Sequence, residues 1–364
     1  MLHPRQLYQE IRHWWRRDLS GPSLCMMMSV CDEADYIADH LLYHRFLGVT
    51  RAYVFLDHCT DNTRELLRAI PWAVPIECNR DTQLGHLTQH QNLCASIALE
   101  LARKEHFDWL LHIDPDEYAW GESSSSGETE GSLVEMLRNV DPGTELVWLR
   151  PKEAVPVQGN QSEKLWAQQY FQEQPNVLKR PMLNPITGQV EQLNKWIGHV
   201  LGKSIVRVSA NAIPVSAHFW GSAHSSGNRE LTREDLGFHY HFVAANARHW
   251  HQKYLKLSWE ADKWEQGITV PFPKQAWKDA SKRLSPGAAK SYFEEWVAIH
   301  PDQANSLVQQ GQLSHEKNVA RTMAQMSRDP VIAIENWLAR QGIPLTLSRR
   351  PWRRLLQKDQ ICTH

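Results

Sequence analysis

Three acidic side chains follow a short apolar segment in the first half of the chain. The segment from Trp109 to Ile113 is bulky and nearly uncharged, which is typical of a strand buried in a parallel sheet. Asp114, Asp116 and Glu117 come directly after it. Ligands of open α/β sheets bind beyond the carboxyl ends of the strands, so we expect these acids at a ligand site. Two carboxylates separated by one residue can hold a hard divalent cation that also binds phosphate oxygens.

A simpler interpretation of the same residues is a solvated turn. Acidic residues often follow a strand, and Asp-Pro is a common start of a turn. Short acidic motifs also produce many false positives. The motif therefore needs support from the rest of the chain before it indicates a metal site.

The residues before this motif alternate between strand and helix patterns. Three apolar runs have the length of strands: 24–30, 51–56 and 74–78. Segments with helical spacing of apolar residues follow them, which favours an α/β fold with a doubly wound, mostly parallel sheet and right-handed crossovers. The first two runs also end in acid, at Asp32 and Glu33 and at Asp57. We expect these acids at the same edge of the sheet as the later motif.

Several short motifs occur in order between residues 22 and 120: Asp32-Glu33-x-x-Tyr36-Ile37, Tyr43-His44, Asp57-x-x-x-Asp61-Asn62-Thr63, and Asp114-x-Asp116-Glu117. This ordered set resembles the family-2-like and family-92-like glycosyltransferases of GT-A fold. An ordered set of motifs is more specific than one acidic triplet. The resemblance implies a GT-A-type, Rossmann-like sheet flanked by helices, and a metal-dependent transfer of a sugar from a nucleotide diphosphate donor.

The resemblance also implies roles for particular side chains in donor binding. Glu33 and Asp57 would line the pocket for the base and ribose of a UDP- or GDP-type donor, and we assign Asn92 to the same site. Asp114 and Asp116 would bind Mn²⁺ or Mg²⁺ together with the sugar diphosphate.

Lys203 is a further candidate for the donor site. The pair Gly202-Lys203 resembles a Gly-Lys pair that the same glycosyltransferases carry after the sheet. An ammonium near the departing diphosphate would act as a point charge on its oxygens. The alternative is a lysine at the exposed start of a strand.

Histidines in the second half of the chain are candidates for a further metal ligand. Side chains of the segment 238–242 alternate between the faces of a predicted strand, so His239 and His241 share one face and three aromatic residues share the other. GT-A enzymes often take a third ligand, frequently a histidine, from downstream of the acidic motif. His218 and His241 are the candidates, and a structural role is the alternative for each.

The predicted function is an inverting, metal-dependent transfer of a sugar to a hydroxyl of a saccharide or glycolipid acceptor. Such a reaction needs a general base opposite the leaving group, and Glu153 and Asp235 are the candidates. One alternative is a metal-dependent nucleotidyl or phosphoryl transferase that uses the same acids. Another is a non-catalytic carbohydrate-binding protein, which the 16 tryptophans suggest.

Changes in pattern along the chain divide it into three predicted parts. Residues 1–21 form a helical lead, 22–243 a GT-A-like catalytic domain, and 244–364 a helical, Trp-rich C-terminal region. Within the catalytic domain, 22–120 would bind the nucleotide sugar and 132–243 would bind the acceptor.

Composition limits the expected partners and location. A net charge of -1 gives no general attraction to nucleic acid. The six cysteines have neither paired metal-ligand spacing nor the density of a disulfide framework, which indicates core thiols in a reducing compartment. Residues 1–17 lack the apolar segment of a signal peptide, and no apolar run is long enough to span a bilayer, so a cytoplasmic location is predicted. The basic segment 349–356 is a candidate for peripheral membrane contact, with a solvated terminal helix as the alternative.

Overall fold

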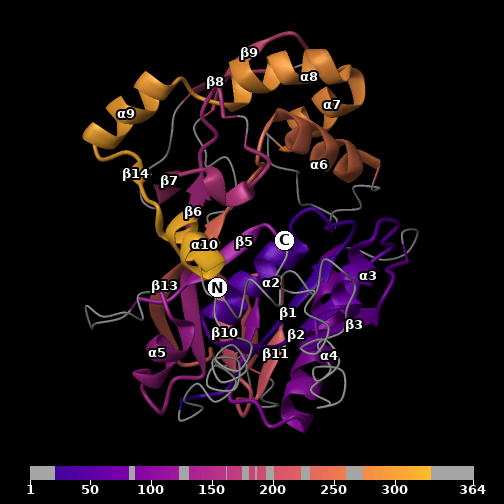
Figure 1. Cartoon of the computed structure of the whole chain (residues 1–364), viewed down its shortest axis with the longest axis vertical. Coiled ribbons are helices and arrows are strands. Elements are labelled where there is room, and N and C mark those ends of the chain that lie inside the picture. Colours follow the sequence, from indigo (N-terminus) through magenta and orange to yellow (C-terminus); the bar gives the residue numbers. More distant parts are fainter. Residues whose placement is uncertain are drawn as a thin grey trace, which may run out of the picture.

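Helices and strands alternate along the described part of the chain. The structure, a computed structural model, describes residues 21–81, 87–122, 131–160, 162–173, 180–184, 187–193, 201–222, 230–259 and 274–328. The strands are β1 (Leu24–Val30), β2 (Val49–Leu56), β3 (Ala73–Glu77), β4 (Trp109–His112), β5 (Glu117–Trp120), β6 (Leu146–Ala154), β7 (Tyr170–Glu173), β8 (Arg180–Leu183), β9 (Val190–Leu193), β10 (Lys203–Arg207), β11 (Ala212–Pro214), β12 (Trp220–Ser222), β13 (Arg233–His241) and β14 (Ser314–His315). The helices are α2 (Ile37–Phe46), α3 (Thr63–Arg68), α4 (Leu87–Lys104), α5 (Leu133–Arg138), η1 (Leu165–Ala167), α6 (Ala247–Trp259), α7 (Lys274–Arg283), α8 (Pro286–Tyr292), η2 (Phe293–Val297), α9 (Pro301–Gln309) and α10 (Asn318–Arg328) (Figure 1).

Alternate residues of β1 pack into two different hydrophobic layers. Met26 and Met28 join one layer, to which helix α2 contributes. Cys25 and Met27 join the other, to which helix α4 contributes. Since successive side chains of a strand point to opposite faces, β1 is buried on both sides. Helices therefore cover both faces of the sheet at β1, and the α/β class is confirmed.

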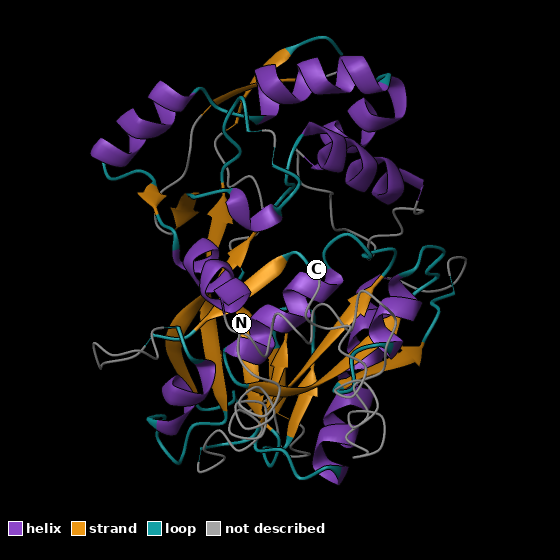
Figure 2. Ribbon diagram, viewed as in Figure 1, coloured by secondary structure: helices purple, strands orange, loops and turns teal. Residues whose placement is uncertain are grey.

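The main sheet is mixed. It has 10 strands in the order β14-β7-β6-β10-β4-β1-β2-β3, with β13 paired to β5 and β6. Figure 2 shows strands as orange arrows, with purple helices beside them. β1 is parallel to β2 and β4, whereas β10 is antiparallel to both of its neighbours, β4 and β6. The sequence predicted a mostly parallel sheet, and the structure corrects this. An apolar strand buried on both faces has the same composition in either direction, so its pattern does not show which way it runs.

Four neighbouring strands bring polar residues into one row of the sheet. β13 lies between β5 and β6, with His241 opposite Glu117 on one side and Glu153 on the other. On the far side of β6, Gln172 of β7 lies opposite Glu153. Residues opposite each other in a sheet share a face, so this row is polar across all four strands. β5 was not predicted from the sequence, because four residues are too short for a clear strand pattern.

Helix α2 is attached to β5 by three polar side chains. His40 Nε2 donates to the Glu117 carbonyl at 2.7 Å, and the Tyr43 hydroxyl donates to the Ala119 carbonyl at 2.9 Å. The Ala119 N–H donates to His44 Nε2 at 3.1 Å. Burial lowers the pKa of both histidines, to about 4 for His40, so both rings are neutral at pH 7. Helix α2 thus fixes β5 and the acidic motif at its start.

The C-terminal helices enclose a second hydrophobic core. Helices α6 to α9 lie together with the β8–β9 hairpin at one end of the molecule in Figure 1. In this core Trp250 stacks on Tyr292 with ring centroids 5.7 Å apart, and it meets Trp277 edge-on at 6.4 Å. Both tryptophans are fully buried. They are core residues, so they do not form a surface for carbohydrate.

Several predicted segments lie outside the described residues. These are the N-terminal lead up to residue 20 and the basic segment 349–356.

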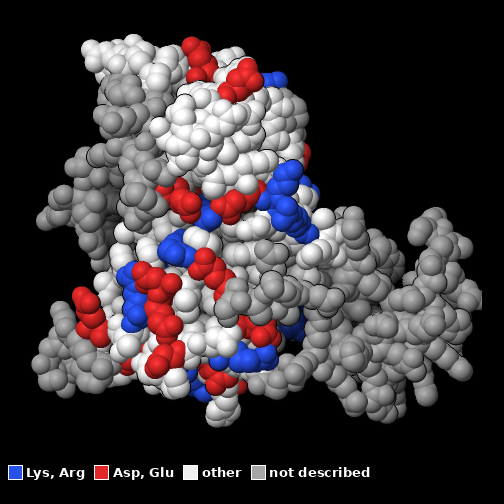
Figure 3. Space-filling view, turned by 90° about the vertical axis from the view of Figure 1, so that its left-hand side faces the viewer, with Lys and Arg blue, Asp and Glu red and all other residues white. Residues whose placement is uncertain are grey.

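On the face shown in Figure 3, Lys and Arg side chains are interspersed with Asp and Glu over the described surface, and this agrees with the net charge of -1. Within the described ranges, no helix is both long and apolar enough to cross a membrane.

Glu316 connects the start of α10 to the sheet. Its carboxylate accepts hydrogen bonds from Lys152 Nζ and, at 2.6 Å, from the Tyr240 hydroxyl. Asn318 Nδ2 donates to the same hydroxyl at 2.9 Å. Burial alone would raise the pKa of Glu316, but the hydrogen bonds from Lys152 and Tyr240 outweigh it and hold this pKa below its usual value. Ionised Glu316 therefore stabilises the folded chain.

We expect Glu316→Gln to lower the free energy of unfolding by about 1 to 3 kcal/mol at neutral pH, because it removes a charged partner of Lys152. Since the folded pKa is depressed, this contribution is complete above the unfolded pKa of about 4.3 and is lost as the pH falls through the folded value. Urea unfolding at neutral pH and in acid should show the difference shrinking in acid. Glu100→Gln, at an exposed pair with Arg103, is the control and should cost less than about 1 kcal/mol. An equal loss at both pH values would contradict the assignment.

Candidate functional site

The loops after β1 and β2 are joined by reciprocal hydrogen bonds. Asp32 accepts from the backbone N–H groups of Thr60 at 2.5 Å and of Asp61 at 3.1 Å. In return, Asp61 accepts from the Ala34 N–H at 3.0 Å. Each loop turns through a left-handed residue, Asp32 with φ of 53° and His58 with φ of 52°, a conformation that non-glycine residues adopt at some cost. The carboxyl ends of the two strands therefore form one hydrogen-bonded edge.

Asp57 and Glu33, the predicted residues of the donor pocket, both belong to this edge. The Asp57 carboxylate is 2.9 Å from the Arg80 side chain and accepts from the Arg80 N–H at 3.0 Å. Glu33 is half-buried. Burial and the nearby Asp116 raise the pKa of Glu33 to about 8, against the opposing effect of Lys256. At pH 7, Glu33 is therefore mostly a neutral acid that can donate a hydrogen bond.

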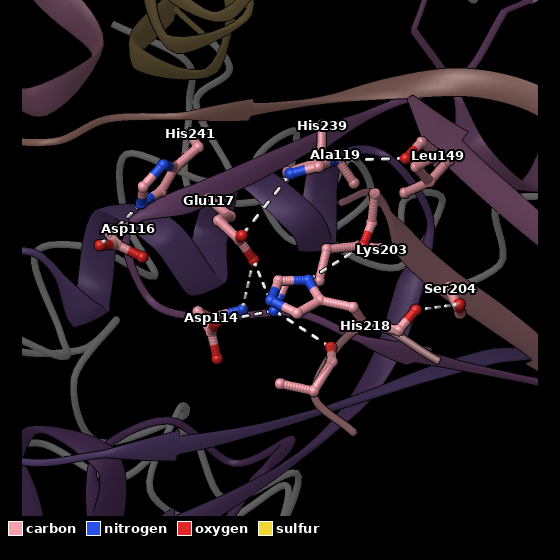
Figure 4. A network of polar contacts seen from close by, with 12 residues as sticks. Asp114, Asp116, Glu117, Ala119, Leu149, Lys203, Ser204, His218, His239 and His241 are labelled. Carbon is pink, nitrogen blue, oxygen red and sulfur yellow. Dashed lines mark hydrogen bonds and ion pairs between the residues drawn. The ribbon is translucent and has the colours of Figure 1, made fainter. Parts of the chain in front are cut away.

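Lys203 is a fully buried cation between two acids of the motif (Figure 4). Its Nζ lies 2.6 Å from Asp114 and 3.2 Å from Glu117, and it donates to the Ala217 carbonyl at 3.2 Å. Burial would lower the pKa of Lys203, but Asp114 and Glu117 raise it above its usual value. Lys203 is thus a charged residue of the site interior and not an exposed lysine at the start of a strand.

Glu117 shares this lysine with Asp114. Its carboxylate accepts from the Asp114 N–H at 2.9 Å and lies 3.6 Å from His239 Nε2. Figure 4 shows Glu117 between His239 and Lys203. Burial raises the pKa of Glu117 to about 7, although Lys203 lowers it. Burial also acts on Asp114, but there Lys203 outweighs it and the pKa is lowered. Asp114 is therefore ionised at pH 7, whereas the charged form of Glu117 is less favoured.

Asp116 contacts a second group of polar side chains. Its carboxylate is 3.3 Å from His241 Nε2 and 2.6 Å from Lys253 Nζ of α6. His241 Nδ1 lies 2.8 Å from Glu153, which is 1% exposed. Burial would lower the pKa of His241, but Glu153 and Asp116 raise it to about 10, so the ring is protonated at pH 7. Glu153 therefore orients the imidazole that faces Asp116.

Two lysines of α6 were missing from the predicted site. Lys253 contacts Asp116, while Lys256 Nζ donates to the Cys31 carbonyl and lies 3.6 Å from Asp32. Residues three apart share a face of a helix, and this spacing was the available signal. Because α6 was predicted to belong to a separate C-terminal region, only the tertiary contact reveals that its lysines reach the edge of the sheet.

The predicted metal ligands fit a divalent cation in part. Asp116 and His241 present an oxygen and a nitrogen to one point, and Glu153 behind the ring is the kind of outer partner that orients metal-binding histidines. Asp114 instead contacts a lysine. No three of the predicted ligands have their ligand atoms within 4.8 Å of one another. A cation at Asp116 and His241 would therefore displace the proton of His241 Nε2 and take its other ligands from water and phosphate.

The turn between β11 and β12 contains His218 and is contacted by Asn92. His218 lies in this turn, and its Nδ1 hydrogen-bonds to the Gly202 carbonyl at 3.1 Å, next to the buried lysine. Asn92 of α4 donates to the Val215 carbonyl of the same turn at 2.9 Å. The Asn92 amide oxygen is buried without a hydrogen-bond partner among the described residues. This turn borders the Lys203 part of the site.

Asp235, a candidate base, lies away from the cluster. Its strand begins at Arg233 and ends at His241, so about 20 Å of extended chain separates Asp235 from the site histidine. Its side chain is 46% exposed, and it accepts from Arg233 at 2.8 Å. β13 extends well before the predicted segment 238–242, which places Asp235 at the far end. The other candidate base, Glu153, belongs to the cluster.

We expect Glu153 and His241 to be energetically coupled. His241→Ala leaves a buried carboxylate without its imidazole contact, which should cost about 3 kcal/mol of unfolding free energy. The double variant His241→Ala with Glu153→Gln should lose less than the sum of the two single losses, by about 1 to 3 kcal/mol. Urea unfolding of all four proteins measures this coupling. The pair Lys164→Ala and Asp39→Asn, where Lys164 is 43% exposed, is the control and should couple by less than about 1 kcal/mol. Additive losses at Glu153 and His241 would contradict the arrangement.

Comparison with known proteins identifies distant relatives of one class. The chain is 23% identical over 245 residues, or 60% of its length, to an Arabidopsis thaliana protein named glycosyltransferase-like. It is 21% identical over 258 residues, or 63% of its length, to a second Arabidopsis thaliana protein of that description. The chain spans about half the length of these curated relatives, 53% and 49%. Both relatives carry the description glycosyltransferase-like.

Two other comparisons add no argument. No model of a known protein family matches the chain. A solved structure described as a mycobacterial protein has 17% sequence identity, covers 57% of this chain and 58% of its own, and has a TM-score of 0.28. This score is too low to support a statement about fold or function.

Proposed function

We propose that the chain is a glycosyltransferase of GT-A type that moves a sugar from a nucleotide diphosphate sugar to a hydroxyl acceptor. The observation that carries the proposal is the edge where β2, β1 and β4 end side by side. Asp57 follows β2, and Asp114 and Asp116 follow β4. Nucleotides bind at such an edge of α/β sheets. The names of the distant relatives agree with this class of reaction.

The base and ribose of the donor would bind at Asp57 and Glu33. Arg80 holds the Asp57 carboxylate in place from two directions. A mostly protonated Glu33 offers both a donor and an acceptor, as the edge of a base requires. We propose a UDP- or GDP-type donor.

The diphosphate would bind between the acidic motif and helix α6. Lys253 and Lys256 bring two ammonium groups to this place. In the proposed complex they would neutralise part of the diphosphate charge. Mn²⁺ or Mg²⁺ held by Asp116 and His241 would supply further neutralisation of the leaving group. Glu153 keeps the His241 ring turned toward Asp116.

The acceptor would be a saccharide or a glycolipid, and we propose an inverting transfer. Glu153 contacts the His241 ring at 2.8 Å and is 1% exposed. A general base must reach the acceptor hydroxyl directly or through one water. We therefore assign Glu153 to orienting His241 and not to proton abstraction.

Thermal unfolding with UDP, GDP and their sugar conjugates, each with and without Mn²⁺, tests the proposal. A nucleotide present at about 100 times its dissociation constant should add about 2.7 kcal/mol of stability. Asp116→Asn removes a charge from the proposed cation site, so Mn²⁺-dependent donor turnover should fall on the order of a hundredfold or more. Glu100→Gln on the exposed face of α4 is the control. The proposal fails if no nucleoside diphosphate shifts the transition, and group transfer from a nucleoside triphosphate would favour a nucleotidyl or phosphoryl transferase.

Lys253 provides a second test, aimed at the diphosphate alone. Lys253→Met should weaken binding of the nucleoside diphosphate by about 10-fold or more, the value of one charge-assisted hydrogen bond. Binding of the corresponding nucleoside should be unchanged, since it has no phosphate. Calorimetric titration of both ligands measures the difference, with Lys278→Met on α7 as the control. Equal weakening of both ligands would show that Lys253 acts through the fold and not on the diphosphate.

A further inference from the structure

Cys78, His90 and Cys94 form a compact group of potential metal ligands. Cys78 follows β3 directly, and His90 and Cys94 lie one turn apart on α4. Cys94 Sγ is 3.8 Å from Cys78 Sγ and 3.6 Å from His90 Nε2. The three ligand atoms all lie within 4.8 Å of one another. Among the residues that the structure describes, this is the one group of three such side chains that meets this limit.

These separations match the edges of a tetrahedral zinc site. Zinc binds sulfur at about 2.3 Å and imidazole nitrogen at about 2.0 to 2.1 Å, usually with tetrahedral geometry. Two sulfurs around such an ion lie about 3.8 Å apart, and a sulfur and a nitrogen about 3.6 Å apart. A disulfide would instead require about 2.05 Å between the sulfurs. The side chains are thus spaced for a shared ion, and Cys78 and Cys94 are free thiols.

The group is largely shielded from water. Cys94 is fully buried, His90 is 6% exposed and Cys78 is half-buried. Binding of Zn²⁺ by both thiols would release two protons to solvent and leave two thiolate ligands.

The position of the group connects it to the edge of the sheet. Between Cys78 and His90 the chain passes through Arg80, which holds the Asp57 carboxylate. An ion bound by Cys78 and by His90 and Cys94 of α4 would fix both ends of the segment between Cys78 and His90. It would thereby hold Arg80, and through it Asp57, at the end of β2.

We propose that Cys78, His90 and Cys94 bind a Zn²⁺ ion, with water in the fourth position, and that the ion joins the end of β3 to α4. The site is separate from the one proposed for Mn²⁺ or Mg²⁺ at Asp116 and His241, and it does not depend on the proposed function. The sequence predicted that all six cysteines are core thiols, and the proposal gives two of them a further role. Soft thiolate ligands select zinc, whereas oxygen ligands suit magnesium and manganese.

Metal analysis of the full-length protein, purified under reducing conditions without a metal-binding tag, tests the proposal. We expect about one zinc ion per chain that survives dialysis. Cobalt substituted for the zinc should give the intense near-ultraviolet absorption of cobalt bound to thiolate. Competition with a chromophoric chelator should show that Cys94→Ser and Cys78→Ser each weaken zinc binding on the order of a hundredfold or more. Cys59→Ser, a half-buried cysteine outside the group, is the matched control and should bind zinc as the parent does.

Two further measurements keep the outcome clear. Circular dichroism shows whether each variant is folded, and His90→Gln replaces one ligand without touching a thiol if a cysteine variant fails to fold. Thiol titration of the parent counts the reduced cysteines. The proposal is overturned if fully reduced parent protein takes up no zinc, if Cys78 and Cys94 are found joined in a disulfide, or if Cys59→Ser weakens zinc binding as much as Cys94→Ser.

Discussion

The burial of Glu117 and the partial burial of Asp114 and Asp116 at the end of β4 are the constraint on which the rest of the site depends. A buried carboxylate costs several kcal/mol unless a cation and hydrogen bonds compensate it. Lys203 provides this for Asp114 and Glu117, and Lys253 provides it for Asp116. Each of these lysines is itself largely removed from water. The charged lysines and carboxylates are therefore stable at this edge only as ion pairs.

This constraint explains the arrangement of the second half of the chain. Lys203 lies on β10, whose antiparallel insertion beside β4 brings its first residue to the end of that strand. His241 lies at the end of β13, and Lys253 lies on α6 directly afterwards. These three elements, all distant in sequence from the acidic motif, thus contribute positive charge to one edge. The first half contributes the acids, and helix α2 fixes them through its hydrogen bonds to β5.

The same charges are suited to a diphosphate in the proposed function. Lys253 now contacts a carboxylate, and a divalent cation on Asp116 would leave that ammonium available to phosphate oxygens. The reciprocal hydrogen bonds between the loops after β1 and β2 hold the neighbouring donor pocket in one shape. Preorganised dipoles and charges of this kind require little rearrangement when a charged ligand binds.

Local patterns in the sequence determined the elements of the first half and the faces of one later strand. Continuous apolar runs predicted β1, β2, β3 and β4 because strands buried on both faces are apolar throughout. The period of two in the segment 238–242 correctly placed His239 and His241 on a face opposite Tyr240, which packs against Phe171. The acids at the strand ends were also predicted at one edge, since parallel strands end on the same side.

Only the tertiary structure decided the directions of the later strands and the partners of each charge. Lys203 contacts Asp114 across 89 residues of sequence, and Lys253 contacts Asp116 across 137. The metal-ligand spacing of the cysteines is likewise invisible in sequence, because Cys78 meets His90 and Cys94 only when β3 packs beside α4. Composition and periodicity indicate whether a segment is buried on one face or on two. They do not show which distant segment packs against it. In this protein, that packing determines the ion pairs of the site.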